Sequence, residues 1–197
     1  MKKFAVAALV AVLSTSAFAA QGDILARFRI TNVNPQTSTN NTLSAVGVDL
    51  KDDTIPELDF TYMFTNNIGA ELILGTSKHT ITSNLGDLGS VKALPPTVTV
   101  QYHFNPEGQF RPYVGAGINY TRFYGLHDDS GLGLSVKKNS FGPALQVGMD
   151  IPVSKSVFIN FDVKKIWMST KVSAGGTELG TLDVNPLVTS VGIGTKF

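Results

Sequence analysis

Apolar and polar residues alternate along most of the chain, in stretches that are separated by turn-forming residues. This period-two pattern is typical of strands with one apolar and one polar face. It predicts eight strands, at residues 23–33, 54–65, 68–82, 93–104, 110–126, 139–151, 156–171 and 182–197. Long connections are expected at 34–53, 83–92, 127–138 and 172–181, with short turns between them. An even-stranded meander of this kind has its long loops at one end and both termini at the other, as transmembrane β-barrels do.

The alternation alone does not say which face points inward, because a soluble lipocalin-type barrel also has eight strands and an apolar interior. Three features favour a membrane barrel: an export signal, a polar face rich in glycine, and a final aromatic residue, Phe197. A narrow lumen requires small residues, whereas a soluble exterior gains nothing from them. We therefore expect an all-β protein, an eight-stranded antiparallel up-and-down transmembrane β-barrel with its apolar face toward lipid.

The first 19 residues have the features of a secretory signal peptide. Lys2 and Lys3 precede the apolar stretch 4–13, and Ala17-Phe18-Ala19 supplies a small-x-small cleavage pattern. Removal of residues 1–19 leaves one domain, the barrel of residues 20–197. We expect it in the outer membrane of a Gram-negative-type bacterium. The formal net charge of +1 argues against a nucleic-acid partner.

The polar face carries charges of both signs. Its cations are Arg27, Arg29, Arg111, Lys164 and Lys196, and its anions are Glu57, Asp59, Glu71, Asp150 and Asp162. Eight strands leave an interior just wide enough for side chains to fill, and buried charges are tolerated when they are paired. We expect a polar network that plugs the lumen; a hydrated channel lined by the same charges is the alternative.

The inward face also carries apolar residues. Ile73, Ile166 and Met168 predict an apolar pocket in the outer half that accepts a hydrophobic small molecule. Met63 and Phe158 are further candidates for lining the channel, and simple space-filling is the alternative role for all of them.

Six of the nine prolines fall near the outer ends of the predicted strands. They are Pro35, Pro56, Pro95, Pro96, Pro143 and Pro186. Because proline cannot donate to a strand ladder, we expect interrupted pairing in the outer wall. This is either ordinary punctuation of strand ends or a lateral opening from the lumen to the membrane.

Several stretches of the chain resemble the OmpW family of small outer-membrane proteins. The longest is residues 110–121, FRPYVGAGINYT; others are VNP at 33–35, FTYM at 60–63, NNIG at 66–69, LPPT at 94–97 and QYHFNP at 101–106. The resemblance covers essentially all of residues 20–197. It implies an apolar channel closed toward the periplasm and passive uptake of small hydrophobic compounds by lateral release. By position, Ile73 matches an apolar constriction, and Lys164 stands where some members have a large aromatic gate.

The sequence shows no pattern for catalysis or metal binding. His79, His103 and His127 lack ligand spacing, and no G-x-S-x-G occurs. We expect that the protein is not an enzyme and that it binds no cofactor and no metal. A lipid-modifying enzyme that uses His103 is the least favoured hypothesis.

Residues and resemblance together predict a channel for passive uptake of small hydrophobic molecules. The alternative is a structural or receptor-type barrel whose extracellular loops bind a partner. We expect three kinds of partner: hydrophobic solutes, outer-membrane lipid including lipopolysaccharide, and the barrel-assembly machinery, which would recognise Phe197. Lys165 is placed to reach the phosphates of lipopolysaccharide.

Overall fold

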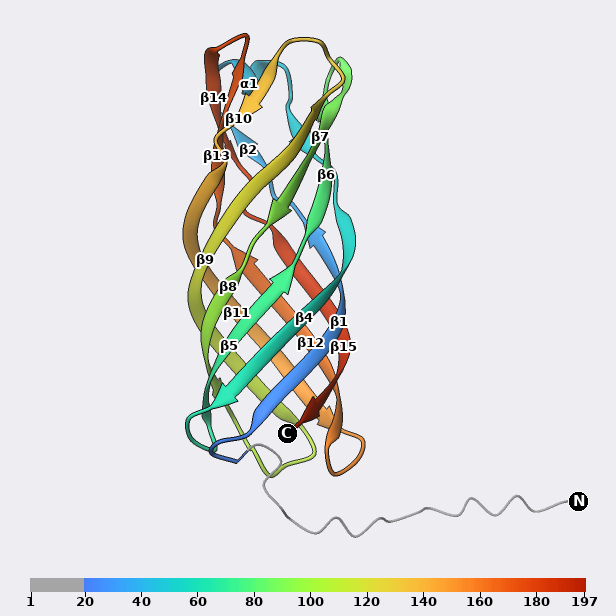
Figure 1. Ribbon diagram of the computed structural model, residues 1–197, viewed down its shortest axis with the longest axis vertical. Coiled ribbons are helices and arrows are strands. Elements are labelled where there is room, and N and C mark those ends of the chain that lie inside the picture. The colour runs from blue at the N-terminus through green and yellow to red at the C-terminus, as the bar shows by residue number, and fades with distance from the viewer. Residues whose placement is uncertain (1–19) are drawn as a thin grey trace, which may run out of the picture.

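The computed structural model describes residues 20–197, in which eight antiparallel strands close into a barrel (Figure 1). In order around the barrel they are β1 (Ile24–Asn34), β4 (Asp53–Met63), β5 (Ile68–Gly75), β8 (Thr97–His103), β9 (Arg111–Asp128), β11 (Asn139–Pro152), β12 (Val157–Ile166) and β15 (Leu187–Lys196). β15 pairs with β1 from Leu25 opposite Lys196 to Asn34 opposite Leu187, which closes the ring. The predicted signal peptide, residues 1–19, lies outside the described residues.

The apolar face of each barrel strand points outward, as predicted. In β8, Val98, Val100 and Tyr102 are 46%, 57% and 46% exposed, whereas the intervening Thr99 and Gln101 are fully buried. Such a surface is favourable against acyl chains. The lipocalin-type orientation, in which these residues would fill the interior, is excluded.

Above the ring, the chain continues into extracellular hairpins (Figure 1, upper half). β6 (Ser77–Ser83) and β7 (Gly86–Leu94) form one hairpin beside the upper part of β9. β13 (Ser169–Ala174) and β14 (Thr177–Asp183) form another, flanked by β10 (Leu134–Val136) and β2 (Ser38–Thr39). The remaining elements are β3 (Asp49–Leu50), which pairs with β6, and the helix α1 (Asn41–Ala45) beside β14. Within residues 20–197, no helix is both long and apolar enough to cross a membrane.

Two of the predicted long loops are wrong. Residues 83–92 and 172–181 are mostly strand, with tight turns at Asn84-Leu85 and Gly175-Gly176. Polar and glycine-containing sequence suggested loops, but strand pairing depends on context and here the neighbouring strands supply the partners. Both Gly175 and Gly176 have positive φ, as a two-residue hairpin turn requires. The helix α1 was not predicted either, because five residues are too few to show a helical stripe.

At four places where the eight-stranded ring meets the hairpins, a short break separates one strand from the next strand that continues in the same direction. β5 gives way to β6 at Thr76, β7 to β8 at Pro95-Pro96, β12 to β13 at 167–168, and β14 to β15 at 184–186. The expected interruption is present at Pro95-Pro96 and at Pro186, whereas Pro56 and Pro143 lie inside the continuous strands β4 and β11. Two groups of β9 bridge the Pro95-Pro96 break: the Tyr120 N–H donates to the Pro96 carbonyl at 3.1 Å, and the buried amide of Asn119 donates to the Pro95 carbonyl at 3.2 Å.

Candidate functional site: an apolar chamber above an ionic lattice

The middle of the lumen is filled by a lattice of buried ion pairs. Arg27 contacts Asp150 at 2.8 Å and Asp59 at 3.1 Å, and Arg29 contacts Glu71 at 3.2 Å. Because inward residues of a strand are two apart, β1 directs both guanidinium groups into the lumen, where each reaches carboxylates from other strands. The lattice thereby ties distant parts of the wall together.

Lys164 forms the upper layer of this lattice. Its ammonium group contacts Glu57 at 3.0 Å and Asp162 at 2.8 Å, and the Tyr113 hydroxyl donates to Asp162 at 2.7 Å. Further amide donors to the lattice carboxylates come from Gln101, Gln146 and Asn160. Lys164, Tyr113 and Asp162 are all almost fully buried. This close filling favours a plugged lumen over the alternative of a hydrated channel.

The two remaining cations of the predicted network lie lower. Arg111 is opposite Asp150 on the neighbouring strand, and its Nε donates to the Gly108 carbonyl at 2.8 Å. Lys196 pairs with Asp23 at 3.4 Å at the periplasmic rim. Strand alternation assigned both residues to the inner face, but it carries no information about height along the barrel axis.

A separate apolar cluster lies beneath the lattice, on the periplasmic side. It consists of Met63, Phe158 and Leu25, all almost fully buried. Glycine makes room for it, because a Cβ atom added at Gly194 would overlap the Phe158 ring. Met63 and Phe158, predicted as channel-lining residues, are thus separated from the other three by the charged layer.

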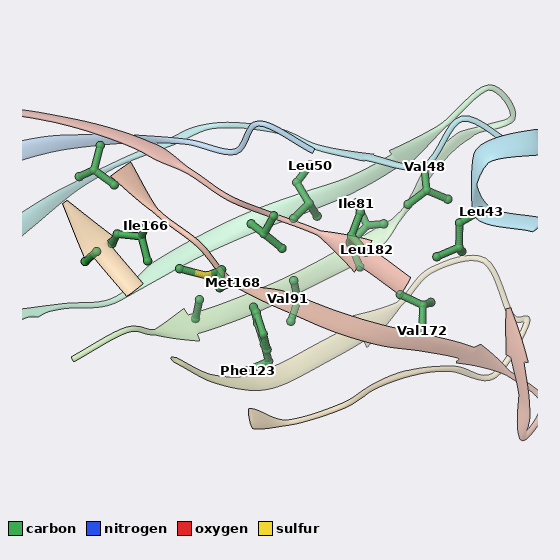
Figure 2. Packing of buried hydrophobic residues seen from close by; sticks show 14 residues of the cluster. Leu43, Val48, Leu50, Ile81, Val91, Phe123, Ile166, Met168, Val172 and Leu182 are labelled. Atoms are coloured by element: carbon green, nitrogen blue, oxygen red, sulfur yellow. The ribbon is translucent and has the colours of Figure 1, made fainter. Parts of the chain in front are cut away.

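An apolar chamber lies above the lattice, enclosed by the hairpins and α1 (Figure 2). It contains a cavity of about 310 Å³. The chamber belongs to a larger cluster of buried apolar residues, which consists of Leu43, Val48, Leu50, Ile81, Val91, Ala93, Phe123, Ala144, Ile166, Met168, Val172, Leu182, Val184 and Val188. In Figure 2 the side chains of Leu43 from α1 and Val172 from β13 point into the same space as Ile81 from β6.

A smaller cavity of about 40 Å³ connects the chamber region with the lattice. It is lined by Ile73, Ile166 and Met168, the three residues predicted to form an apolar pocket, and Lys164 is also in its wall. Val91 and Phe123 line both cavities. The structure therefore brings the predicted gate position, Lys164, to the floor of the apolar space.

Sequence reasoning missed most of the chamber. Leu43, Val48, Val91 and Val172 fell in regions assigned to loops, where a buried apolar face was not expected. A signal was present in Val91 and Ala93, two residues apart and both buried, which continue the strand alternation upward.

The histidines do not form a site. The His79 ring lies 2.8 Å from the Lys51 carbonyl and 2.9 Å from the Ser77 hydroxyl, and the His103 ring lies 2.9 Å from the side-chain oxygen of Gln101. Within residues 20–197 no group of three or more metal-binding side chains comes together.

A closed eight-stranded ring with a lipid-facing apolar belt, a plugged lumen and an external apolar chamber defines an outer-membrane β-barrel. The chain belongs to the OmpW family, whose family model matches residues 20–197. It is 37% identical to outer membrane protein W of Escherichia coli, over 100% of both chains. It is 40% identical to the uncharacterized outer-membrane protein y4mB of Sinorhizobium fredii, over 87% of this chain and 79% of that protein.

Two proteins of Pseudomonas aeruginosa extend the comparison. The crystal structure of the outer membrane protein OprG matches with a TM-score of 0.82 and 29% identity, over 92% of this chain and 99% of that chain. The dibenzothiophene metabolism operon protein PahQ is 31% identical, over 76% of this chain and 74% of that protein. The protein is thus an OmpW-family barrel of the Gram-negative outer membrane.

Proposed function

We propose that the protein takes up small hydrophobic molecules passively, receiving them from outside in the chamber and releasing them sideways into the membrane. The observation that supports this most directly is the apolar chamber, whose volume of about 310 Å³ is that of a small ligand pocket. Beneath it the charged lattice opposes further descent, because an apolar solute cannot replace the contacts of buried ions.

The wall of the smaller cavity supports a sideways exit. Pro95 and Pro186, from two of the interrupted strand courses, line this cavity together with Ile73. These prolines have no N–H to donate, so at these points the wall has only the hydrogen bonds that their carbonyls accept, and separating it costs less than elsewhere in the ring. The name of PahQ refers to the metabolism of dibenzothiophene, an apolar aromatic compound, which makes that compound a suitable probe.

The chamber is tested by filling it. Ile81→Trp places a large ring into the cavity, and Val153→Trp, at an exposed periplasmic turn, is the matched control. In cells that have this protein as their only OmpW-type barrel, initial uptake of labelled dibenzothiophene should fall about tenfold with Ile81→Trp and stay unchanged with the control. Equal uptake by both variants would contradict the proposal and favour the receptor-type alternative.

The lateral exit is tested by locking the wall. The chain contains no cysteine, so a pair introduced at Pro96 and Tyr120 is the sole thiol pair. Opposed antiparallel positions lie within disulfide distance. Oxidation should slow dibenzothiophene uptake and reductant should restore it, whereas a pair at Val98 and Ile118, one step lower in the wall, should have no effect. Equal inhibition by both pairs would contradict exit at the proline break.

We further propose that the protein is no enzyme, that cleavage after Ala19 yields the mature chain, and that Phe197 is read by the assembly machinery. The mass of the protein isolated from outer membranes should correspond to a chain beginning at Ala20. Phe197→Ala should lower the amount assembled without changing the amount synthesised. An unchanged amount of assembled protein would contradict the proposal that the assembly machinery recognises Phe197.

A further inference from the structure

Three cations gather on the outer surface of the barrel, on the far side of the wall from the chamber. Lys78 of β6 lies directly opposite Lys92 of β7, and Lys92 lies opposite Tyr124 of β9. Arg122 precedes Tyr124 by two residues, so it is on the same face. All three cationic side chains are exposed.

The protein itself does not compensate these charges. Like charges directly opposite each other destabilise a sheet, and Lys78 and Lys92 are such a pair. Among the described residues, no carboxylate forms an ion pair with Lys78, Lys92 or Arg122; Asp53 accepts a hydrogen bond only from the Lys78 backbone N–H, at 2.7 Å. Two other exposed lysines are paired, Lys51 with Asp87 and Lys171 with Glu178.

The surroundings of the three cations are apolar on the membrane side. Leu74, Leu94 and Tyr120 are each about 40% exposed on the lipid-facing surface. The Tyr124 hydroxyl lies 2.7 Å from the Thr76 hydroxyl, so the aromatic side chain extends from β9 toward the junction of β5 and β6. It therefore lies close to the three cationic residues. The site is thus half cationic and half apolar.

Its height matches the level of lipid headgroups. Pro112 to Arg122 is ten residues of β9, which at the usual rise and tilt of barrel strands span about 25 Å along the membrane normal. This is the height of the apolar band of an outer-membrane barrel. Arg122 therefore stands at the upper edge of the band, next to the phosphate layer of the outer leaflet.

We propose that Lys78, Lys92 and Arg122 bind the phosphate groups of a phosphorylated outer-leaflet lipid whose acyl chains lie on Leu74, Leu94 and Tyr120. Arginine pairs with phosphate through two parallel hydrogen bonds, and the two lysines supply point charges. Lys165, expected from the sequence to meet such phosphates, instead donates to the Asn185 carbonyl and is half-buried. The headgroup site is on β6, β7 and β9, and solute uptake is not part of it.

The test uses the full-length mature protein in neutral detergent, titrated with bisphosphorylated lipid A and followed by native mass spectrometry. Lys78→Ser/Lys92→Ser/Arg122→Ser should bind on the order of a hundredfold more weakly than wild type. The control, Lys51→Ser/Lys155→Ser/Lys171→Ser, changes the net charge equally but removes two paired lysines and one at a periplasmic turn, and should bind like wild type. Retention of the compact form in SDS without heating verifies that each variant is folded.

Two further titrations distinguish the kind of ligand. Removal of both phosphates from lipid A should abolish the difference between wild type and the site variant. Millimolar inorganic phosphate should not displace the bisphosphorylated lipid, because it lacks the acyl chains. Equal losses in the site and control variants would show attraction by net charge alone and overturn the proposal, as would displacement by inorganic phosphate.

Discussion

The lattice and the chamber lie in the same barrel, yet their interiors are chemically opposite. In the lattice, Arg29 and Glu71 are almost fully buried and mutually paired, with close filling around them. In the chamber, Ile81 and Val172 border unfilled space. A paired charge has one favourable arrangement, whereas aliphatic side chains tolerate several. The lower region is therefore suited to hold shape and the upper region to admit variable solutes.

Among the changes to the lattice, Arg29→Ala is expected to lower the free energy of unfolding most. Loss of the guanidinium leaves Glu71 and Asp59 buried without one of their cations, at a cost of about 3–5 kcal/mol in the free energy of unfolding. Urea unfolding in lipid vesicles, followed by fluorescence of the single Trp167, measures it. The exposed pair serves as control: Lys171→Ala should cost under about 1 kcal/mol. Equal costs would mean that burial does not distinguish the two kinds of pair.

The chamber side is tested at its lid. Leu43 of α1 is 1% exposed and closes the chamber from above. Leu43→Ala should cost about 3 kcal/mol or less, since Leu43 already borders unfilled space and has fewer packing contacts to lose than a fully packed leucine. The same variant should speed uptake of solutes bulkier than dibenzothiophene in the cell assay. Slower uptake of those solutes would show that Leu43 contributes to binding rather than closure.

Lys164 lies at the boundary between the lattice and the chamber, and Lys164→Met tests whether a solute in the chamber reaches this boundary. Methionine keeps the length of the side chain and extends the apolar surface downward, while Glu57 and Asp162 lose a donor at a cost of about 2 kcal/mol. Dibenzothiophene should bind more tightly to the purified variant, as measured by fluorescence titration. Unchanged affinity would mean that the solute does not reach the lattice.

The smallest effect is expected in an extracellular connection. The pKa of Asp128 lies below its usual value because the Ser130 hydroxyl donates to the carboxylate at 2.6 Å, assisted by the Leu134 N–H at 2.9 Å. A lowered pKa means that these bonds favour the ordered turn at neutral pH and are lost as the pH falls through that pKa. Exchange of the Leu134 amide should accelerate below about pH 4 relative to its intrinsic rate. Asp128→Asn should remove this pH dependence, and lattice amides should show no such change.

The sequence was sufficient for the ring and for the identity of its inner face. Val98, Val100 and Tyr102 alternate with Thr99 and Gln101, and that period is enough to assign each side. Height along the axis was not predictable, which is why Lys196 was grouped with the lattice although it pairs with Asp23 at the rim.

The chamber was predicted only where it continues a barrel strand. Ile166 and Met168 lie at the top of strand courses whose alternation is clear, whereas Leu43 lies on a short helix with no periodic signal. The burial of Leu43 depends on contact with β14, a segment more than 130 residues later in the chain. Single-sequence patterns do not contain such contacts.

The pairing of the first strand with the last has a consequence for biogenesis. Arg27 and Asp150 are 123 residues apart in the chain, and β1 gains its second neighbour only when β15 arrives. During export, a partly translocated polypeptide has arginines and carboxylates that still lack their cross-lumen counterparts. We expect truncation before residue 187 to yield a chain that periplasmic chaperones retain and proteases degrade, instead of a smaller version of the barrel.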